Sequence, residues 1–249
     1  MSDATTADLD PKVTQVAPGV RQVAVGEPFL SYVYLLDSPE GTVAFDAGLR
    51  GTGPEILAAA GGPIARVVLS HAHADHRGGA PELGAPIFCH PDEVADAEAA
   101  WPQAYLDFSK IENERVREAL PALNEAWDSG PLTIAGTITE GDQVADFTVV
   151  HAPGHAPGEI ALFRPADGLL LAGDVIYTQD LETMTPSPAR VPHPFANWDT
   201  DQARTSIRKL AALAPTSAWT GHAANVTGDV VAQLEAAAAF GEAAVVAES

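Results

Sequence analysis

Short apolar runs separated by glycine and proline dominate the first half of the chain. Many of these runs contain β-branched residues or alternate with polar ones, which is typical of strands. They predict strands at Val13–Val16, Val20–Val25, Tyr32–Leu36, Thr42–Phe45, Arg66–Ser70 and Pro86–Cys89. Helices are expected from Pro54 to Ala60, with proline in the first turn, and over Asp92–Ala100.

The second half of the chain has the same pattern of short apolar runs separated by glycine and proline. Strands are expected at Leu132–Ile134, Val144–Val150, Glu159–Phe163, Leu169–Ala172 and Ser217–Thr220. Asp199 resembles a helix N-cap with Gln202 three residues on, and a closing helix is expected over Asp229–Val246. Runs of strands followed by helices, twice over, predict an α/β fold of two stacked β-layers with helices outside.

Residues 101–127 have a different pattern and indicate a helical insertion in a single domain that spans 1–249. Aromatic and aliphatic residues recur at helical spacing, with Pro102 and Pro121 as interruptions. The insertion is either a packed flank or a wall of the substrate pocket. The segment Glu182–Pro194, which holds four prolines, is expected to be an ordered loop at the pocket rim. The sequence leaves open whether either segment forms a lid.

Composition narrows the choice of partner. The 249 residues include 34 acidic and 13 basic side chains, a net charge of −21 with three lysines, which disfavours nucleic acid and anionic lipid. No apolar run approaches the roughly 18 residues that a membrane span needs. The start lacks the pattern of a secretory signal, and the single cysteine excludes an intrachain disulfide. We therefore expect a soluble cytoplasmic protein with a small-molecule substrate; a homodimer stays open.

The strongest chemical signal is the hexamer His71-Ala72-His73-Ala74-Asp75-His76. On a strand His71 and His73 would share one face, and Asp75 and His76 could turn toward a second point on the loop that follows. Imidazole nitrogen and carboxylate oxygen are ligands that suit zinc and similar metals. The hexamer can therefore present two groups to one ion and two to its neighbour.

Further candidate ligands follow predicted strands later in the chain. His155 lies in a His-Ala-Pro-Gly-His segment, Asp174 follows Gly173, and His222 follows Gly221. Loops at strand ends that converge on one rim are common places for functional sites. These residues are expected to meet the hexamer there.

These motifs, together with Asp46-Ala47-Gly48 after an apolar strand, resemble the metallo-β-lactamase superfamily over about residues 13–225. The resemblance implies an αββα sandwich, with two mixed sheets and helices on the outer faces, and a site for two divalent metal ions. Zinc is expected, with iron or manganese as alternatives. By position, the resemblance assigns His71, His73 and His155 to one ion. It assigns the remaining ligands as follows: Asp75, His76 and His222 to the other ion, Asp174 as a bridge, and Asp46 as a residue that orients a ligand.

The same resemblance implies a hydrolase in which a metal-bound hydroxide attacks the carbonyl of a small ester, lactone or thioester. Asp75 would accept or relay the proton. Tyr177, three residues after Asp174, matches a feature of the lactonase branch, and its hydroxyl either donates to the substrate oxygen or only packs below the site. The glyoxalase II branch is also similar, although no lysine or arginine follows His222.

Other reactions stay open as alternatives. One is a mononuclear iron persulfide dioxygenase that uses His71, His155 and Asp174, and another is a β-lactam hydrolase. Zinc β-lactamases often use a cysteine ligand, whereas Cys89 lies in a strand-like run and is expected to be a small buried residue. A third alternative is a binding module without activity.

Overall fold

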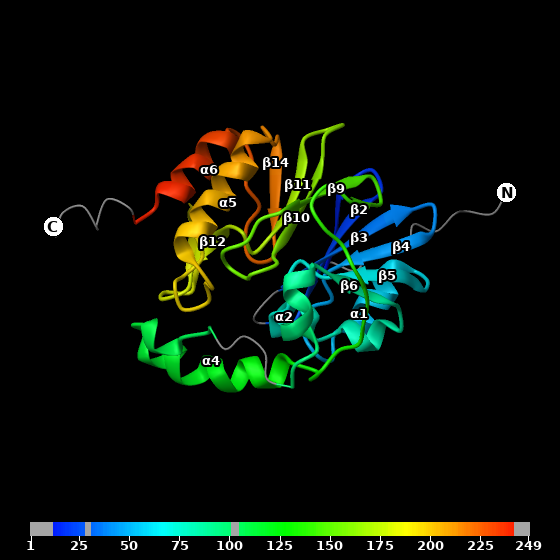
Figure 1. Ribbon diagram of the computed structural model, residues 1–249, viewed down its shortest axis with the longest axis horizontal. Helices are drawn as coiled ribbons and strands as arrows, with labels where there is room; N and C mark the ends of the chain where they lie inside the picture. The colour runs from blue at the N-terminus through cyan, green and yellow to red at the C-terminus, as the bar shows by residue number, and fades with distance from the viewer. Residues whose placement is uncertain (1–11, 28–30, 101–104, 242–249) are drawn as a thin grey trace.

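Two β-sheets face each other in the computed structural model, which describes residues 12–27, 31–100 and 105–241 (Figure 1). The larger sheet has its strands in chain order: β1 (Val13–Ala17), β2 (Val20–Val25), β3 (Ser31–Ser38), β4 (Gly41–Phe45), β5 (Ile64–Val68), β6 (Ile87–Cys89) and β7 (Ile134–Thr137). Pairing is antiparallel from β1 to β4 and parallel from β4 to β7, so the sheet is mixed.

The second sheet is built from the later strands in the order β14 (Ser217–Thr220), β11 (Leu169–Gly173), β10 (Ile160–Arg164), β9 (Phe147–His151) and β8 (Gln143–Val144). Only β11 and β14 pair in parallel among these described strands, so this sheet is also mixed. A separate antiparallel hairpin consists of β12 (Tyr177–Asp180) and β13 (Thr185–Arg190).

Helices lie on the outer faces of both sheets (Figure 1). The α-helices are α1 (Gly53–Ala60), α2 (Ala74–Arg77), α3 (Val94–Ala97), α4 (Glu114–Trp127), α5 (Thr200–Ala212) and α6 (Val230–Ala239). Short 3₁₀ turns are η1 (Ala80–Leu83), η2 (Pro91–Glu93) and η3 (Phe108–Lys110). Across the described residues, none of the helices has both the length and the apolar character that crossing a bilayer requires.

Alternation along the strands divides the core into layers. In β4, Val43 and Phe45 pack between the sheets, whereas Ala44 points outward into the cluster that contains Ile56 of α1. The outer face of the second sheet packs on α5 and α6 in the same way. The order helix, sheet, sheet, helix confirms the predicted αββα sandwich.

The predicted insertion and rim loop differ in detail from the structure. Pro121 does not interrupt the helix, because it lies inside α4, which is 14 residues long. Trp101 and Pro102 lie outside the described residues. Part of the segment 182–194 is not a loop, since residues 185–190 form β13 and pair with β12. The prolines of β13 are tolerated because this short hairpin has edges that need no further strand partner.

Some predicted boundaries also shift. The strand expected at Val144–Val150 is a tight β8–β9 hairpin, since Ala145 has a positive φ of 53°. The helix expected over Asp92–Ala100 is reduced to η2 and the four residues of α3. The Asp199 cap is confirmed, because its Oδ1 accepts a hydrogen bond from Gln202 N at 2.9 Å. The closing helix ends at Ala239, and residues 242–246 lie outside the described part of the chain.

Candidate metal centre

Five chain segments that follow strands bring polar residues to one edge of the sandwich. Asp46 follows β4, Asp174 follows β11 and His222 follows β14. The hexamer from His71 to His76 is not on a strand: β5 ends at Val68, His71 and His73 lie in the loop before α2, and His76 lies in its single turn. The loop after β9 contributes His155. The sandwich therefore positions these side chains on segments that each begin at the end of a strand.

One group of donors consists of His71, His73 and His155. Their ligand nitrogens lie within 4.8 Å of one another, and all three residues are buried. His155 Nε2 lies 3.0 Å from His73 Nδ1. This geometry places three imidazole nitrogens around one point.

A second group consists of Asp75, His76 and His222. His222 Nε2 lies 3.1 Å from Asp75 Oδ2 and 3.3 Å from His76 Nε2. Asp174 lies between the two groups, because its Oδ2 is 3.4 Å from His222 Nε2 and 3.7 Å from His155 Nε2. The structure thus brings all seven predicted ligand residues together.

Asp46 fixes the orientation of two of these imidazoles. Its Oδ2 accepts hydrogen bonds from His76 Nδ1 at 2.9 Å and from Ser70 Oγ at 2.8 Å. Since that hydroxyl donates to Asp46, it can accept from His71 Nδ1, which lies 2.9 Å away. His71 then carries its proton on Nδ1 and turns the lone pair of Nε2 toward the cluster. His76 also holds a proton on Nδ1. Burial disfavours its charged form, but the carboxylates of Asp174, Asp46 and Asp75 outweigh burial and raise its pKa well above the usual value, so its Nε2 must release a proton to bind a cation.

The other two buried imidazoles are held in the same manner by different partners. His155 Nδ1 lies 3.3 Å from Asn197 Oδ1, which can only accept, so Nδ1 donates. His73 Nε2 lies 2.9 Å from the hydroxyl of Tyr105, which leaves its Nδ1 facing the cluster. The contact with Asn197 fixes the tautomer that a metal ligand needs at His155, whereas the Tyr105 hydroxyl, which can donate or accept, fixes only the orientation of the His73 ring.

Burial and charge set the protonation of the site. Burial, reinforced by the neighbouring imidazoles, holds the pKa values of His71 and His73 well below the usual value. Burial lowers the pKa of His155 as well. Burial also disfavours the charged form of His222, but the carboxylates of Asp174 and Asp75 outweigh it and raise its pKa to about 10. The first group is therefore neutral and ready to bind a cation.

The donor atoms fit a pair of divalent cations. Within the described chain, His71 Nε2 and Asp174 Oδ1 are buried and have no hydrogen-bond partner, although His76 Nε2 lies 3.3 Å from that carboxylate oxygen. Buried polar atoms without partners are costly and call for an explanation. A cation between neutral imidazoles and carboxylates would satisfy them, and imidazole with carboxylate is the ligand set that zinc and iron accept.

The sequence did not predict two buried carboxylates that lie beside the candidate ligands. Glu93 accepts from Ala72 N at 2.8 Å and from Gly158 N at 2.7 Å, and so ties the hexamer to the loop that carries His155. Glu159 accepts from Asp174 N at 2.8 Å. Burial raises the pKa of Glu93 to about 7. Glu159 could have been predicted from the sequence, because it is a glutamate at the start of an expected buried strand. No comparable feature of the sequence marks Glu93.

Gly221 is required by the close approach of two ligands. A Cβ atom at this position would collide with Asp174 Oδ1 and would lie 2.8 Å from His76 Cε1. The glycine before His222 therefore allows the segment after β14 to bring that imidazole against the Asp174 carboxylate.

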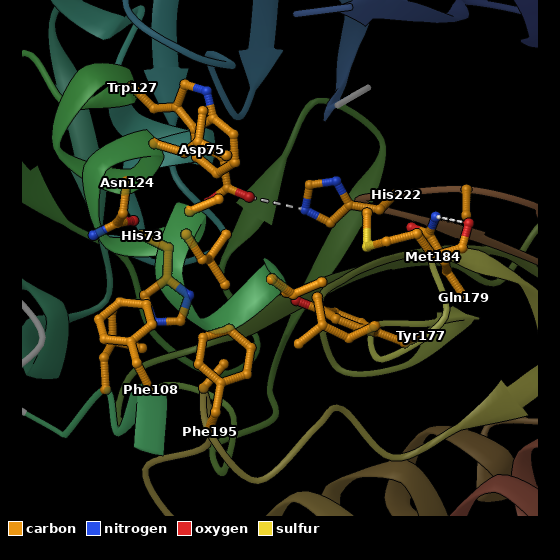
Figure 2. Close-up of a pocket in the computed structure, with 18 of the residues that line it drawn as sticks. His73, Asp75, Phe108, Asn124, Trp127, Tyr177, Gln179, Met184, Phe195 and His222 are labelled. Atoms are coloured by element: carbon orange, nitrogen blue, oxygen red, sulfur yellow. Dashed lines mark hydrogen bonds and ion pairs between the residues drawn. The ribbon is translucent and has the colours of Figure 1, made fainter. Parts of the chain in front are cut away.

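A cavity of about 340 Å³ opens beside the cluster (Figure 2). His73, Asp75 and His222 line one part of it, together with Tyr177. The hydroxyl of Tyr177 donates to Asp174 Oδ2 at 2.9 Å. Tyr177 therefore faces the candidate centre as well as the cavity.

The remaining histidines lie outside the cluster. His90 Nδ1 accepts from Asp92 N at 3.3 Å at the start of η2, and its ring stacks on His151 with centroids 4.0 Å apart. His193 Nε2 lies 3.1 Å from Glu182 Oε1. Cys89 is fully buried, as expected.

Comparisons with known proteins agree with this architecture. Residues 26–222 match the family model of the Metallo-beta-lactamase superfamily. The probable metallo-hydrolase YflN of Bacillus subtilis is 27% identical over 233 residues, which cover 86% of this chain and 87% of that protein. A hydroxyacylglutathione hydrolase of Bdellovibrio bacteriovorus is 29% identical over 153 residues, covering 59% of this chain and 49% of that protein.

A similar architecture is found in the metallo-beta-lactamase family protein TTHA1429 from Thermus thermophilus. Its crystal structure has a TM-score of 0.67 and 24% identity, and the match covers 94% of this chain and 82% of the other. The architecture of two sheets with outer helices agrees with the family match, which covers most of the chain. The chain belongs to the metallo-β-lactamase superfamily.

Proposed function

We propose that this member of a metallo-hydrolase superfamily is a dinuclear hydrolase that cleaves a small ester, thioester or lactone. One observation carries the proposal: two groups of histidine and aspartate ligands lie side by side, and Asp174 contacts a histidine of each, His155 and His222. A single ion would leave one of these groups without a role. Two cations held by a shared carboxylate are suited to hydrolysis.

The assignment of ligands follows the two groups. His71, His73 and His155 would hold one cation, and Asp174 would contact both cations. The second cation would be held by the following residues: Asp75, His76 and His222. When bound, the cations supply Lewis-acid polarisation of a carbonyl and activation of water. Zinc is the proposed metal because neutral imidazole with carboxylate is its common ligand set.

The side chains around the cations move the proton and stabilise charge. In the reaction a bond forms between the water oxygen and the carbonyl carbon, and the bond from that carbon to the leaving oxygen or sulfur breaks. Asp75, which lines the cavity, takes the proton from water and passes it to the leaving atom. Tyr177 turns its hydroxyl from Asp174 to the oxygen on which negative charge develops.

The test combines metal analysis with a substrate panel. We expect two zinc ions per chain, hydrolysis of at least one ester, thioester or lactone, and loss of turnover with a chelator. Asp75→Ala and His73→Ala should abolish turnover while circular dichroism still shows a folded chain. His151→Ala is the matched control, since it removes an imidazole outside the cluster. A zinc-loaded protein that hydrolyses none of these compounds, nor a β-lactam, would contradict the proposal.

The same experiment separates the alternative reactions. A mononuclear iron dioxygenase that uses His71, His155 and Asp174 would contain one iron per chain and consume oxygen with a persulfide. Turnover of β-lactams alone would favour the β-lactam hydrolase. The second ligand group, which includes His222, favours the dinuclear hydrolase over the iron enzyme.

A further inference from the structure

Helix α4 has an apolar face that the core covers only in part. Val116 and Leu120 pack against a small cluster of Ile111, Phe195 and Ala196, and Trp127 packs against the cluster that contains Ile56, whereas Leu123 belongs to neither of these clusters of described residues. Val116, Leu120, Leu123 and Trp127 are four, three and four residues apart, and this spacing places them on one face of the helix. All of α4 lies in the described chain, and none of its residues is fully buried. An apolar face of a helix normally packs against another layer, so this face requires an explanation.

This face lines the cavity beside the candidate metal centre. All four residues belong to its wall, and Leu181 and Met184 contribute from the β12–β13 hairpin. Figure 2 shows Trp127 and Met184 among the side chains of this wall. The same cavity continues to His73, Asp75 and His222. The apolar face of α4 therefore faces the space next to the proposed reacting atoms.

The charge of the wall restricts what fits there. Apart from the cluster side chains, Arg115 is the charged residue among the described residues that line the cavity. A phosphate-bearing or multiply anionic group would need several cations and hydrogen-bond donors. Apolar walls with a few polar groups are suited to a neutral, apolar ligand, and a volume of about 340 Å³ is within the usual range for such sites.

We propose that this cavity binds an unbranched apolar chain attached to the scissile carbonyl, on either its acyl or its leaving-group side. The proposal rests on the proposed function and names its substrate class: esters or thioesters with a medium-length chain. One water occupies about 30 Å³ in the liquid; if a methylene takes a similar volume, the cavity accommodates on the order of ten carbons. The chain covers the apolar face of α4 and brings the carbonyl to Asp75 and Tyr177.

A chain-length series tests the proposal. For the zinc-loaded protein, p-nitrophenyl esters from acetyl to dodecanoyl measure the acyl side, and acetate esters of alcohols of increasing length measure the other. A buried methylene contributes about 0.8 kcal/mol, so kcat/KM should rise about fourfold per carbon in one of the two series. The rise should stop near ten carbons. A flat profile in both series would overturn the proposal.

Two variants of α4 that add the same negative charge, one inside the cavity and one outside it, provide a matched comparison. Leu123→Asp should remove most of the increase from acetyl to decanoyl, because it places a carboxylate against the chain. Ala122→Asp adds the same charge at an exposed neighbouring position of α4 and should retain the increase. If Leu123→Asp instead dissociates a dimer in sedimentation and keeps the chain-length profile, this face binds a second copy of the chain and the proposal is wrong.

Binding without turnover distinguishes this inference from the proposed function. In calorimetry, 1-decanol should bind more than 100-fold more tightly than 1-butanol, from six additional methylenes. Equal affinities would overturn the inference. A protein that binds decanol with this preference but hydrolyses nothing would support the chain site and contradict the hydrolase. An active hydrolase whose kcat/KM does not depend on chain length would support the hydrolase and contradict the chain site.

Discussion

Asp46 connects two candidate ligands, and its replacement by asparagine tests how strongly a residue outside the ion groups controls metal affinity. The carboxylate accepts from Ser70 N at 2.7 Å, Ser70 Oγ at 2.8 Å and His76 Nδ1 at 2.9 Å. Asparagine has almost the same shape but a single acceptor oxygen. Its amide group must therefore face at least one of these buried donors.

The size of the effect follows from these contacts. A hydrogen bond to a charged acceptor contributes about 1.5–3 kcal/mol, which corresponds to roughly 10–100-fold in affinity. The loss falls on metal binding in particular, because His76 can keep a partner by moving its proton to Nε2, the atom that faces the cluster. Outer residues of metal sites typically have effects of about this size.

The assay is a zinc titration of Asp46→Asn in competition with a coloured chelator. We expect the Kd for zinc to rise by about 10–100-fold, while circular dichroism shows that the chain is folded. Glu40→Gln removes the same charge at an exposed turn and should leave the Kd unchanged. A folded Asp46→Asn protein with the Kd of the original chain would refute the reasoning.

Three further predictions concern single side chains near the site. Tyr177→Phe should retain two metal ions but lower kcat on the order of 100-fold, as steady-state kinetics will show; an unchanged kcat would reduce Tyr177 to a packing residue. Burial, with the charges of Glu93 and Glu98, raises the pKa of the Cys89 thiol to about 12, so a disulfide reagent at pH 8 should label the chain only after denaturation. Burial also raises the pKa of Glu93 from 4.5 to about 7, so the folded state binds the extra proton between these values and stability falls as pH rises through them. In urea unfolding of the metal-free chain, the free energy of unfolding should fall by about 3 kcal/mol over this pH range, and the Glu93→Gln variant should lack this fall. If the free energy of unfolding depends on pH in the same way in both proteins, the prediction is wrong.

Strand positions and the main ligand motif were predictable because both depend on local sequence. The alternation in Thr42–Phe45 reflects two different packing faces, and the structure places Ala44 opposite to its neighbours as that pattern requires. The hexamer from His71 to His76 is contiguous, so its chemistry was visible without any tertiary information. The helix expected after Asp199 depended on a local cap and was also found.

Residues that hold the ligands could not be predicted, because their partners are distant in sequence. Tyr105 contacts His73 across 32 residues, and Asn197 contacts His155 across 42. Neither has a spacing or a neighbour that distinguishes it from an ordinary loop residue. The strand at 185–190 was missed for a related reason, since its prolines favour a loop unless a partner strand lies beside it.

The attachment of α4 has a consequence for the divergence of related enzymes. Before its first turn, Asn113 N donates to Glu182 Oε2 at 2.7 Å, and past its last turn Asp128 pairs with Arg77 at 2.6 Å. Between these two anchors none of the side chains is fully buried, so changing one that lines the cavity without joining a core cluster, such as Leu123, should cost less stability than a change in the core. If the apolar face of α4 binds the substrate chain as proposed, changes on this one helix would vary the substrate while the candidate metal ligands stay constant.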